Sequence, residues 1–288
     1  MTTTERRYTI TEHTLVGQRG EMRYWQSGPR QGIPVVLVHG YGAMIEHWRR
    51  VMRPIAREHT LYALDLYYFG YSARPREAAT KEIWTDQIAE FISEVVGEPA
   101  IVVGHSIGGV PVSQLAYDYP AMVKGLALVN STGVGDPNEK ASFTDKLFFE
   151  LIRAPGFGEM MASVIATPNG VRQGLMSAYH RKEMVTEELV NALSGPVIRF
   201  GGSSYLAVSR SFDRFSLDIK PGAIQVPALI IWGKEDHSIP VAVAEMIRDA
   251  FLPHAEISII PNSGHCPFDE TPQEFCDIFL QWSRRVSG

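Results

Sequence analysis

The fold is decided by one short stretch, Val102-Val103-Gly104-His105-Ser106-Ile107-Gly108-Gly109. The β-branched residues at its start are typical of a central strand. Gly104 and Gly108 flank Ser106 at the spacing of the G-x-S-x-G nucleophile elbow, in which a serine occupies a strained turn between a strand and a helix. Glycines suit these positions because β-carbons would clash where strand and helix approach each other. The pentapeptide alone fits a glycine-rich loop with a helix-capping serine equally well.

Outward from this stretch, apolar runs alternate with amphipathic helical patterns. Strands are expected at residues 34–38, 60–65, 123–129, 226–232 and 255–260, besides the one that leads into the elbow. Helices are expected at residues 45–57, 80–96, 241–251 and 272–285, and from the elbow to about residue 119. This order predicts an α/β fold with a mainly parallel, twisted sheet and helices on both faces. The alternation within residues 8–27 suggests two antiparallel edge strands in addition.

The alternation of strands and helices stops between about Gly133 and Leu217. This segment has helical pieces rich in Phe and Met, among them residues 143–149, and shows no convincing buried strand. We therefore expect residues 1–133 and 218–288 to form two parts of one α/β core, with residues 134–217 inserted as a helical cap. The alternative is a second helical domain with a core of its own.

Three polar residues that could take part in catalysis each follow a predicted strand. Ser106 follows the central strand, Asp236 follows the strand at 226–232, and His265 follows the last strand. Active-site residues of open parallel sheets gather beyond the carboxyl ends of the strands. Each of these residues alone has an ordinary explanation, as a helix cap or a loop residue. Together they have the chain order Ser, Asp, His of the α/β-hydrolase triad.

With these motifs the sequence resembles the α/β-hydrolase superfamily, in its serine-nucleophile branch with a helical cap domain, which holds esterases and C–C bond hydrolases. The resemblance covers about residues 20–285. It rests on His39-Gly40, Asp65 with Gly70 and Ser72, Gly104-His105-Ser106-Ile107-Gly108-Gly109, Trp232-Gly233-x-x-Asp236 and Gly264-His265-x-Pro267-x-x-Glu270-x-Pro272. One departure is Tyr68, where relatives usually have glycine. It leaves open whether Tyr67 and Tyr68 face the pocket.

The resemblance implies a two-step nucleophilic mechanism. Ser106 is expected to attack a carbonyl carbon, His265 to carry the proton, and Asp236 to orient the imidazole. The backbone N–H groups of Ile107, which follows the nucleophile, and of Tyr41, by resemblance, are expected to form the oxyanion hole. No metal or organic cofactor is required.

Other polar residues near these motifs are expected to stabilise the structure rather than to take part in catalysis, apart from one reserve candidate for the acid. His105 is expected to pack away from the serine, and His39 to stabilise the oxyanion loop. Asp65 is expected to fix its own loop as a hydrogen-bond acceptor. Glu235 is the reserve for the acid of the triad, and Cys266 is expected to be a small buried residue rather than a nucleophile.

Composition limits the partners of the chain. The 288 residues include 45% hydrophobic ones, 27 Lys plus Arg and 32 Asp plus Glu. With no dense basic face, nucleic acid is not expected as a partner, and no apolar run is long enough to span a bilayer. Two cysteines are too few for a disulfide framework, and Met1–Arg7 lack the apolar segment of a signal peptide. We therefore expect a cytoplasmic monomer or homodimer.

The leading hypothesis for function is a serine esterase acting on small or medium apolar substrates. The single Gly40 before Tyr41 suggests the simpler form of oxyanion loop, and the apolar cap suggests an apolar acyl or alcohol group. The alternatives are a C–C bond hydrolase of diketone-like acids, an amidase, a cofactor-free perhydrolase, and a small-molecule receptor on this scaffold. Dehalogenase and epoxide-hydrolase relatives carry aspartate at the nucleophile position, so Ser106 argues against both.

Overall fold

The computed structural model describes residues 8–29, 32–133, 154 and 156–287. Within them one sheet holds eight strands in the order β1-β2-β4-β3-β5-β6-β7-β8. The strands are β1 (Thr11–Gly17), β2 (Gly20–Ser27), β3 (Val35–Val38), β4 (Leu61–Leu64), β5 (Ala100–His105), β6 (Val123–Val129), β7 (Ala228–Gly233) and β8 (Glu256–Ile260). Across the sheet from β4 to β8 all neighbours are parallel, whereas β1 and β2 are antiparallel. The predicted α/β fold and the antiparallel edge pair are both confirmed.

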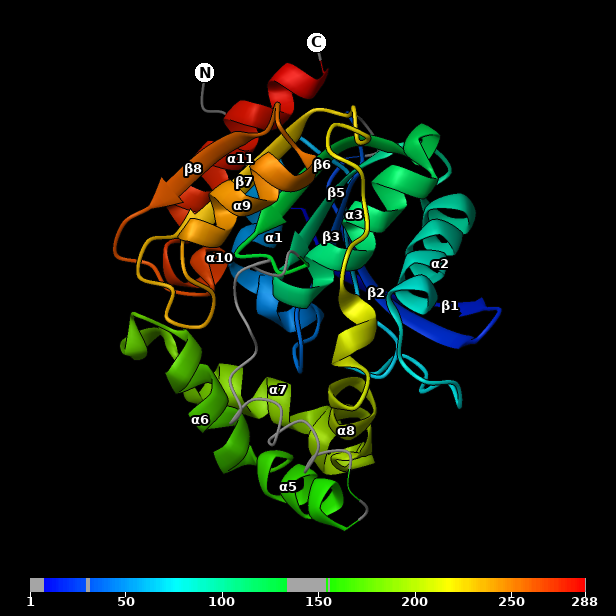
Figure 1. Cartoon of the computed structure of the whole chain (residues 1–288), viewed down its shortest axis with the longest axis vertical. Helices are drawn as coiled ribbons and strands as arrows, with labels where there is room; N and C mark the ends of the chain where they lie inside the picture. The colour runs from blue at the N-terminus through cyan, green and yellow to red at the C-terminus, as the bar shows by residue number, and fades with distance from the viewer. Residues whose placement is uncertain (1–7, 30–31, 134–153, 155, 288) are drawn as a thin grey trace.

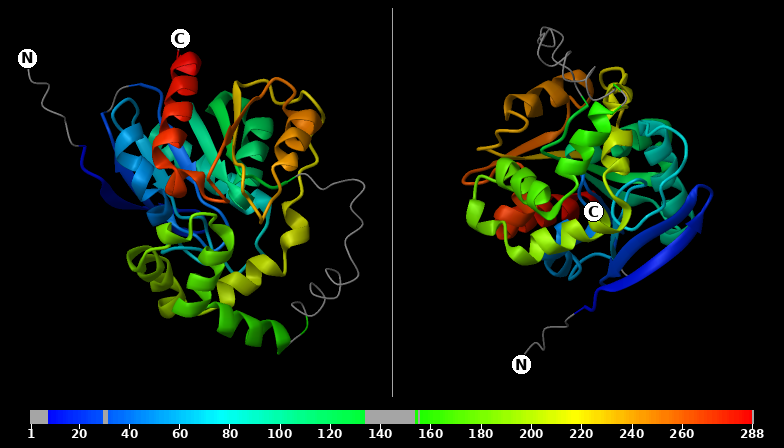
Figure 2. Two further views of the ribbon diagram at one scale, coloured as in Figure 1. Left: turned by 90° about the vertical axis from the view of Figure 1, so that its left-hand side faces the viewer. Right: turned by 90° about the horizontal axis from the view of Figure 1, so that it is seen from below.

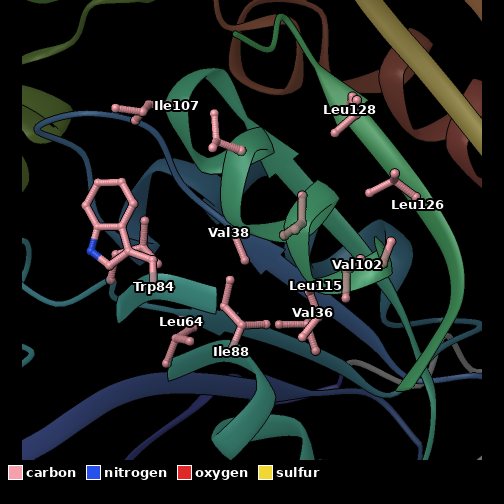
Figure 3. Packing of buried hydrophobic residues seen from close by; sticks show 14 of the residues in the cluster. Val36, Val38, Leu64, Trp84, Ile88, Val102, Ile107, Leu115, Leu126 and Leu128 are labelled. Atoms are coloured by element: carbon pink, nitrogen blue, oxygen red, sulfur yellow. The ribbon is translucent and has the colours of Figure 1, made fainter. Parts of the chain in front are cut away.

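Helices cover both faces of the sheet, as predicted (Figure 1). One face carries α2 (Lys81–Phe91), α3 (Gly109–Asp118) and α9 (Ala242–Phe251), and the other carries α1 (Arg49–Ile55) and α11 (Pro272–Ser287). Side chains alternate between the faces of a strand. Val36 and Val38 of β3 therefore pack in the layer of α2 and α3, where Figure 3 shows them beside Trp84 and Leu115. Val35 and Leu37 pack in the opposite layer.

Between β6 and β7 the described chain forms helices and turns, although these two strands are hydrogen-bonded neighbours. The inserted helices, as we call them, are α5 (Phe157–Ile165), α6 (Pro168–Ala178), α7 (Glu187–Phe200) and α8 (Ser203–Ser209), with the 3-10 turns η5 (Lys182–Met184) and η6 (Phe212–Phe215). They lie together at one end of the sheet (Figures 1 and 2). The helical pieces expected around residues 143–149 lie outside the described residues, and the three-part domain division stays a prediction. No helix in the described ranges is long and apolar enough to cross a membrane.

Several element boundaries differ from the expected ones by a few residues, and two of them have a clear local cause. The strand expected from Val226 begins at Ala228 because Pro227 has no N–H for the ladder. The Pro227 carbonyl still accepts from the Leu126 N–H at 2.9 Å. The segment expected as a helix from residue 45 begins instead with the 3-10 turn η1 (Ile45–Trp48), which leads directly into α1. Such turns are frequent where α-helices begin.

Candidate active site

Ser106 follows β5 directly and begins the 3-10 turn η3 (Ser106–Gly108) that leads into α3. Its φ of 54° lies in the left-handed region, which is a strained conformation for serine. A β-carbon at Gly104 would lie 2.6 Å from the main chain of Gly108 and Gly109, and one at Gly108 would lie 2.3 Å from the His39 carbonyl oxygen. The two glycines therefore allow the close approach of strand and helix on which the elbow depends.

His265 and Asp236, which follow β8 and β7, are in direct contact. The imidazole donates from Nδ1 to Asp236 Oδ2 at 2.8 Å. Asp236 Oδ1 accepts from the Ser238 and Ile239 N–H groups at 2.7 and 3.0 Å. Burial works to raise the pKa of Asp236, but the hydrogen bond and charge of His265, with the other donors, hold that pKa below its ordinary value. The ionised carboxylate keeps a proton on Nδ1, which leaves Nε2 of a neutral ring free to accept one.

One cavity of about 270 Å³ is lined by both Ser106 and His265. Its apolar wall comes largely from the inserted helices. It includes Ile165, Val171, Leu175, Ala178, Leu193 and Tyr205. No hydrogen bond joins Ser106 Oγ to the His265 ring among these described residues. Such catalytic hydrogen bonds are often long in a free site and tighten when substrate binds.

A second cavity, of about 420 Å³, also has Ser106 and Tyr41 in its wall. It is lined further by Ile107, Thr132, Gly133, Phe212, Phe215, Ser216 and Ile239. None of the residues that line either cavity, all from the described part of the chain, is Lys, Arg, Asp or Glu. Ser106 therefore lies between two largely uncharged compartments.

A larger groove of about 770 Å³ opens between β2 and the end of α7, and its lining includes Arg23, Arg74 and Arg199. Neither Ser106 nor His265 lines it. The groove is larger, but the predicted nucleophile and the predicted base both line the smaller cavity instead.

The backbone N–H groups of Tyr41 and Ile107 donate to no acceptor in the described chain. Both residues line the 420 Å³ cavity with Ser106. Glycine at position 40 lets the loop before Tyr41 lie close to Ser106, since a β-carbon there would lie 2.9 Å from both Ser106 Cβ and His105 Nδ1. Two free donors beside a nucleophile are the feature that an oxyanion hole requires.

His39 fixes the loop that precedes Tyr41. Its Nε2 accepts from the Leu66 N–H at 3.0 Å, so the ring proton lies on Nδ1, which donates to the Gly40 carbonyl at 2.8 Å. Burial lowers the pKa of His39 to about 4. A neutral, fully bonded imidazole agrees with the structural role expected for it.

Asp65 is fully buried and holds its own loop. Its carboxylate accepts from the Ile45 and Tyr71 N–H groups, both at 2.8 Å, and from the Arg23 guanidinium at 3.2 Å. Burial raises the pKa of Asp65, against the opposing effect of Arg23. These contacts match the expected loop-fixing role.

The two tyrosines left open by the sequence do not line either cavity at Ser106. The Tyr67 hydroxyl donates to the Gly20 carbonyl at 3.4 Å and the Tyr68 hydroxyl to the Glu77 carbonyl at 3.0 Å. Tyr68 has a φ of 75°, a left-handed backbone conformation that glycine adopts most readily.

His105 and Cys266 both line the 270 Å³ cavity. His105 Nε2 donates to the His265 carbonyl at 2.9 Å, and burial lowers its pKa well below the ordinary value, so the ring is neutral. Burial raises the pKa of the Cys266 thiol well above its usual range. A protonated thiol is a poor nucleophile, in keeping with the role expected for Cys266.

Asn130 is a site residue that the sequence analysis missed. It follows β6 directly, has a φ of 42°, and donates from Nδ2 to Asp236 Oδ2 at 2.7 Å. Its Oδ1 accepts from the Gly233 N–H at 3.1 Å. The available signal was its place as a polar residue directly after a buried strand. Glu235, the reserve acid, instead accepts from the Ser263 N–H at 3.1 Å.

Comparisons with known proteins agree with this architecture. The chain matches the model of the alpha/beta hydrolase family over residues 35–278. It is 26% identical to a pimeloyl-[acyl-carrier protein] methyl ester esterase of Cronobacter sakazakii, over 92% of this chain and 98% of the relative. It is 27% identical to a 2-hydroxymuconate semialdehyde hydrolase of Pseudomonas sp. CF600, over 86% of this chain and 85% of the relative.

Among solved structures, the epoxide hydrolase CorEH superposes with a TM-score of 0.80 at 21% identity, over 96% of this chain and all of that one. At that identity the likeness shows the fold alone, and one fold supports many reactions. The match to the family model spans most of the sequence, with the strand that precedes His39 near its start and His265 near its end. This chain belongs to the alpha/beta hydrolase family.

Proposed function

We propose that this protein is a serine hydrolase that cleaves carboxylic esters of small or medium apolar substrates through an acyl-enzyme on Ser106. The observation that carries the proposal is the cavity that Ser106 shares with His265, whose ring is bonded to Asp236. A nucleophile, a base within the same cavity and a third group that orients the base are the signature of nucleophilic catalysis.

Acylation begins when Ser106 Oγ attacks the ester carbonyl carbon and its proton passes to His265 Nε2. The imidazolium that forms is stabilised by the Asp236 carboxylate. The carbonyl oxygen becomes an oxyanion and accepts hydrogen bonds from the Tyr41 and Ile107 N–H groups. When the tetrahedral intermediate collapses, the C–O bond of the ester breaks and the leaving alkoxide takes the proton from Nε2.

Deacylation repeats this sequence with water. His265 Nε2 accepts a proton from water as its oxygen attacks the acyl carbon, and the same two N–H groups stabilise the second oxyanion. The bond to Ser106 Oγ then breaks, the serine recovers its proton from His265, and the carboxylic acid leaves.

The lining of the two cavities supports an uncharged, apolar substrate. Aliphatic side chains of α6 and α7 dominate the smaller one, and Phe212 and Phe215 contribute aromatic rings to the larger one. With Ser106 between them, the cavities are suited to the acyl and alcohol portions of one ester. The relative from Cronobacter sakazakii, a methyl ester esterase, supports the same bond type.

A second candidate is cleavage of a carbon–carbon bond in a diketone-like acid. The relative from Pseudomonas, a 2-hydroxymuconate semialdehyde hydrolase, favours this reaction. A substrate acid carries a carboxylate, which a low-dielectric site accepts at a high cost unless a cation is present. Because the described lining holds no Lys or Arg, we place ester hydrolysis first.

The test is a panel of p-nitrophenyl esters of increasing acyl length, assayed beside a diketone-like acid, with Ser106→Ala as the matched control. We expect turnover of short and medium esters by the wild type and none above background by the variant. Faster turnover of the diketone acid than of any ester would make the second candidate the correct one.

Two further outcomes would replace the proposal. An anilide of the best acyl group, if cleaved faster than its ester, would indicate an amidase, and peracid formation from an ester with hydrogen peroxide as the favoured reaction would indicate a perhydrolase. Tight binding of an apolar ligand with no turnover of any compound would indicate a receptor.

A further inference from the structure

The loop that carries His265 presses against the chain at the end of α6. The His265 N–H donates to the Ala178 carbonyl at 3.1 Å. A β-carbon at Gly264 would lie 2.5 Å from the His180 backbone nitrogen and 2.9 Å from the Ala178 oxygen. The glycine therefore lets two backbones meet directly, one from the core and one from the inserted region.

The same two segments share the carboxylate of Glu270, a residue of the sequence motif to which the mechanism assigns no role. Glu270 is fully buried. Its Oε1 accepts from the N–H groups of Gly264 and Cys266, on either side of His265, at 3.0 and 3.1 Å. Its Oε2 accepts from the N–H groups of His180 and Arg181, both at 2.8 Å.

Each carboxylate oxygen thus bonds a different segment. Backbone N–H groups only donate, so both oxygens act as acceptors, as in an ionised carboxylate. The Arg181 side chain adds a bond from Nη1 to the Glu270 carbonyl at 2.9 Å. Four donors on a fully buried anion satisfy a group that would otherwise be very costly to bury.

We propose that Glu270 is a positioning residue, which together with the backbone of Ala178–Arg181 holds the His265 loop in its working place. We call this arrangement the histidine clamp. The proposal rests on the proposed function, in which His265 is the base. With the histidine clamp, the inserted region has two roles. Its helix α6 lines the cavity through Val171 and Leu175, and the chain at the end of α6 holds the His265 loop.

The neighbouring Asp269 provides a matched control. It is also fully buried and also bonds the inserted region, through the Tyr179 hydroxyl at 2.7 Å. Its remaining partners are Arg49 and Arg50, at 3.0 and 2.8 Å, and its carboxylate has no bond to the His265 loop. Asp269→Asn therefore disturbs a buried acid at the same interface but leaves in place the four hydrogen bonds that the Glu270 carboxylate accepts.

Glu270→Gln tests the clamp because one amide cannot replace two accepting oxygens. Whichever way the amide turns, its NH₂ group faces two backbone N–H groups, so one of the two segments loses its acceptor. A reacting group displaced by about 1 Å can cost about a hundredfold in rate. We expect kcat for p-nitrophenyl acetate to fall by about that factor, with KM within about twofold of the wild type.

The spectroscopic readout is the downfield proton resonance of the His265 Nδ1–H in the full-length protein. We expect this resonance to shift or broaden in Glu270→Gln and to persist in Asp269→Asn. The kcat of Asp269→Asn should stay within about threefold of the wild-type value, even if its melting temperature falls as far as that of Glu270→Gln. A wild-type kcat and resonance in Glu270→Gln would overturn the proposal, as would equal losses in both variants.

Gly264→Ala is the second variant, and it decides the matter if Glu270→Gln does not fold. It keeps Glu270 but forces the two backbones apart, so we expect the same loss of kcat and the same change of resonance. A folded Gly264→Ala protein with normal kcat would contradict the clamp. If the wild type cleaves no ester, the proposed function fails, while the resonance still reports whether Glu270 holds His265.

Discussion

His265 Nδ1 and Asp236 Oδ2 lie 2.8 Å apart although the two residues are 29 positions apart in the sequence. The pairing of β7 with β8 explains this contact. The two strands are parallel neighbours from Leu229↔Glu256 to Gly233↔Ile260, so they end at the same edge of the sheet. The loops after them meet there, and a single strand, β6, separates β7 from β5, which leads into Ser106.

The first prediction distinguishes the two adjacent acids. Asp236→Asn should lower kcat by about ten-thousandfold, because the amide no longer holds the imidazole in the productive tautomer. Glu235→Gln should cost less than about tenfold, since the only hydrogen bond of the Glu235 carboxylate in the described chain is from the Ser263 N–H. Steady-state kinetics on one ester measure both. Should Asp236→Asn retain full activity, the acid is wrongly assigned and Glu235 is the next candidate.

The second prediction concerns the pH dependence of stability. The pKa of Asp236 is depressed in the folded protein, so this group contributes stability above the unfolded-state pKa, near 4. That contribution is lost as the pH falls through the folded value. The wild type should therefore exceed Asp236→Asn in melting temperature at pH 7, and the difference should shrink below about pH 4. A difference that stays constant down to pH 3 would show that the carboxylate charge stabilises nothing.

The third prediction concerns Tyr68. Glycine at this position relieves a left-handed backbone strain of about 1–2 kcal/mol. It also removes a ring that is 2% exposed, and truncating a buried aromatic side chain costs about 3–5 kcal/mol. Tyr68→Gly should therefore destabilise the protein by about 2 kcal/mol in denaturant unfolding. Activity per folded molecule should be unchanged, and a selective loss of kcat would mean that the tyrosine does contribute to the site.

The fourth prediction concerns the inserted region. If residues 134–217 are an insertion, a short linker in their place should leave a folded, soluble sheet domain, because β6 and β7 already pair directly. Circular dichroism and gel filtration measure this. The shortened protein should still be inactive on p-nitrophenyl acetate, since the histidine clamp is lost with residues 178–181. Wholesale aggregation would indicate that the helices complete the core.

Much of the fold could be predicted from local sequence. Apolar runs such as Val35–Val38 form strands buried on both faces, and Ser106, Asp236 and His265 each follow a strand end. Strand ends are local features, and a parallel sheet brings them to one edge. The assignment of roles to these residues remains a prediction that the proposed experiments test.

The rest of the site depends on contacts between distant segments. Asn130 reaches Asp236 across 106 positions of the chain, and Glu270 reaches His180 across 90. No periodicity or spacing encodes such a pair, because each partner is chosen by the packed structure. For the same reason the sequence does not predict whether the side chains of Tyr67 and Tyr68 face the cavity at Ser106. Their hydroxyls bond main-chain carbonyls in loops that a pattern of residues does not locate.

The most direct test of Ser106 as the nucleophile is intact-protein mass spectrometry after treatment with an alkyl fluorophosphonate. We predict one adduct on the wild type, mapped by peptide digestion to Ser106, and none on Ser106→Ala. The ester turnover of that variant should be lower by about a million-fold. An adduct on another residue, or undiminished turnover in Ser106→Ala, would contradict the assignment of Ser106 as the nucleophile.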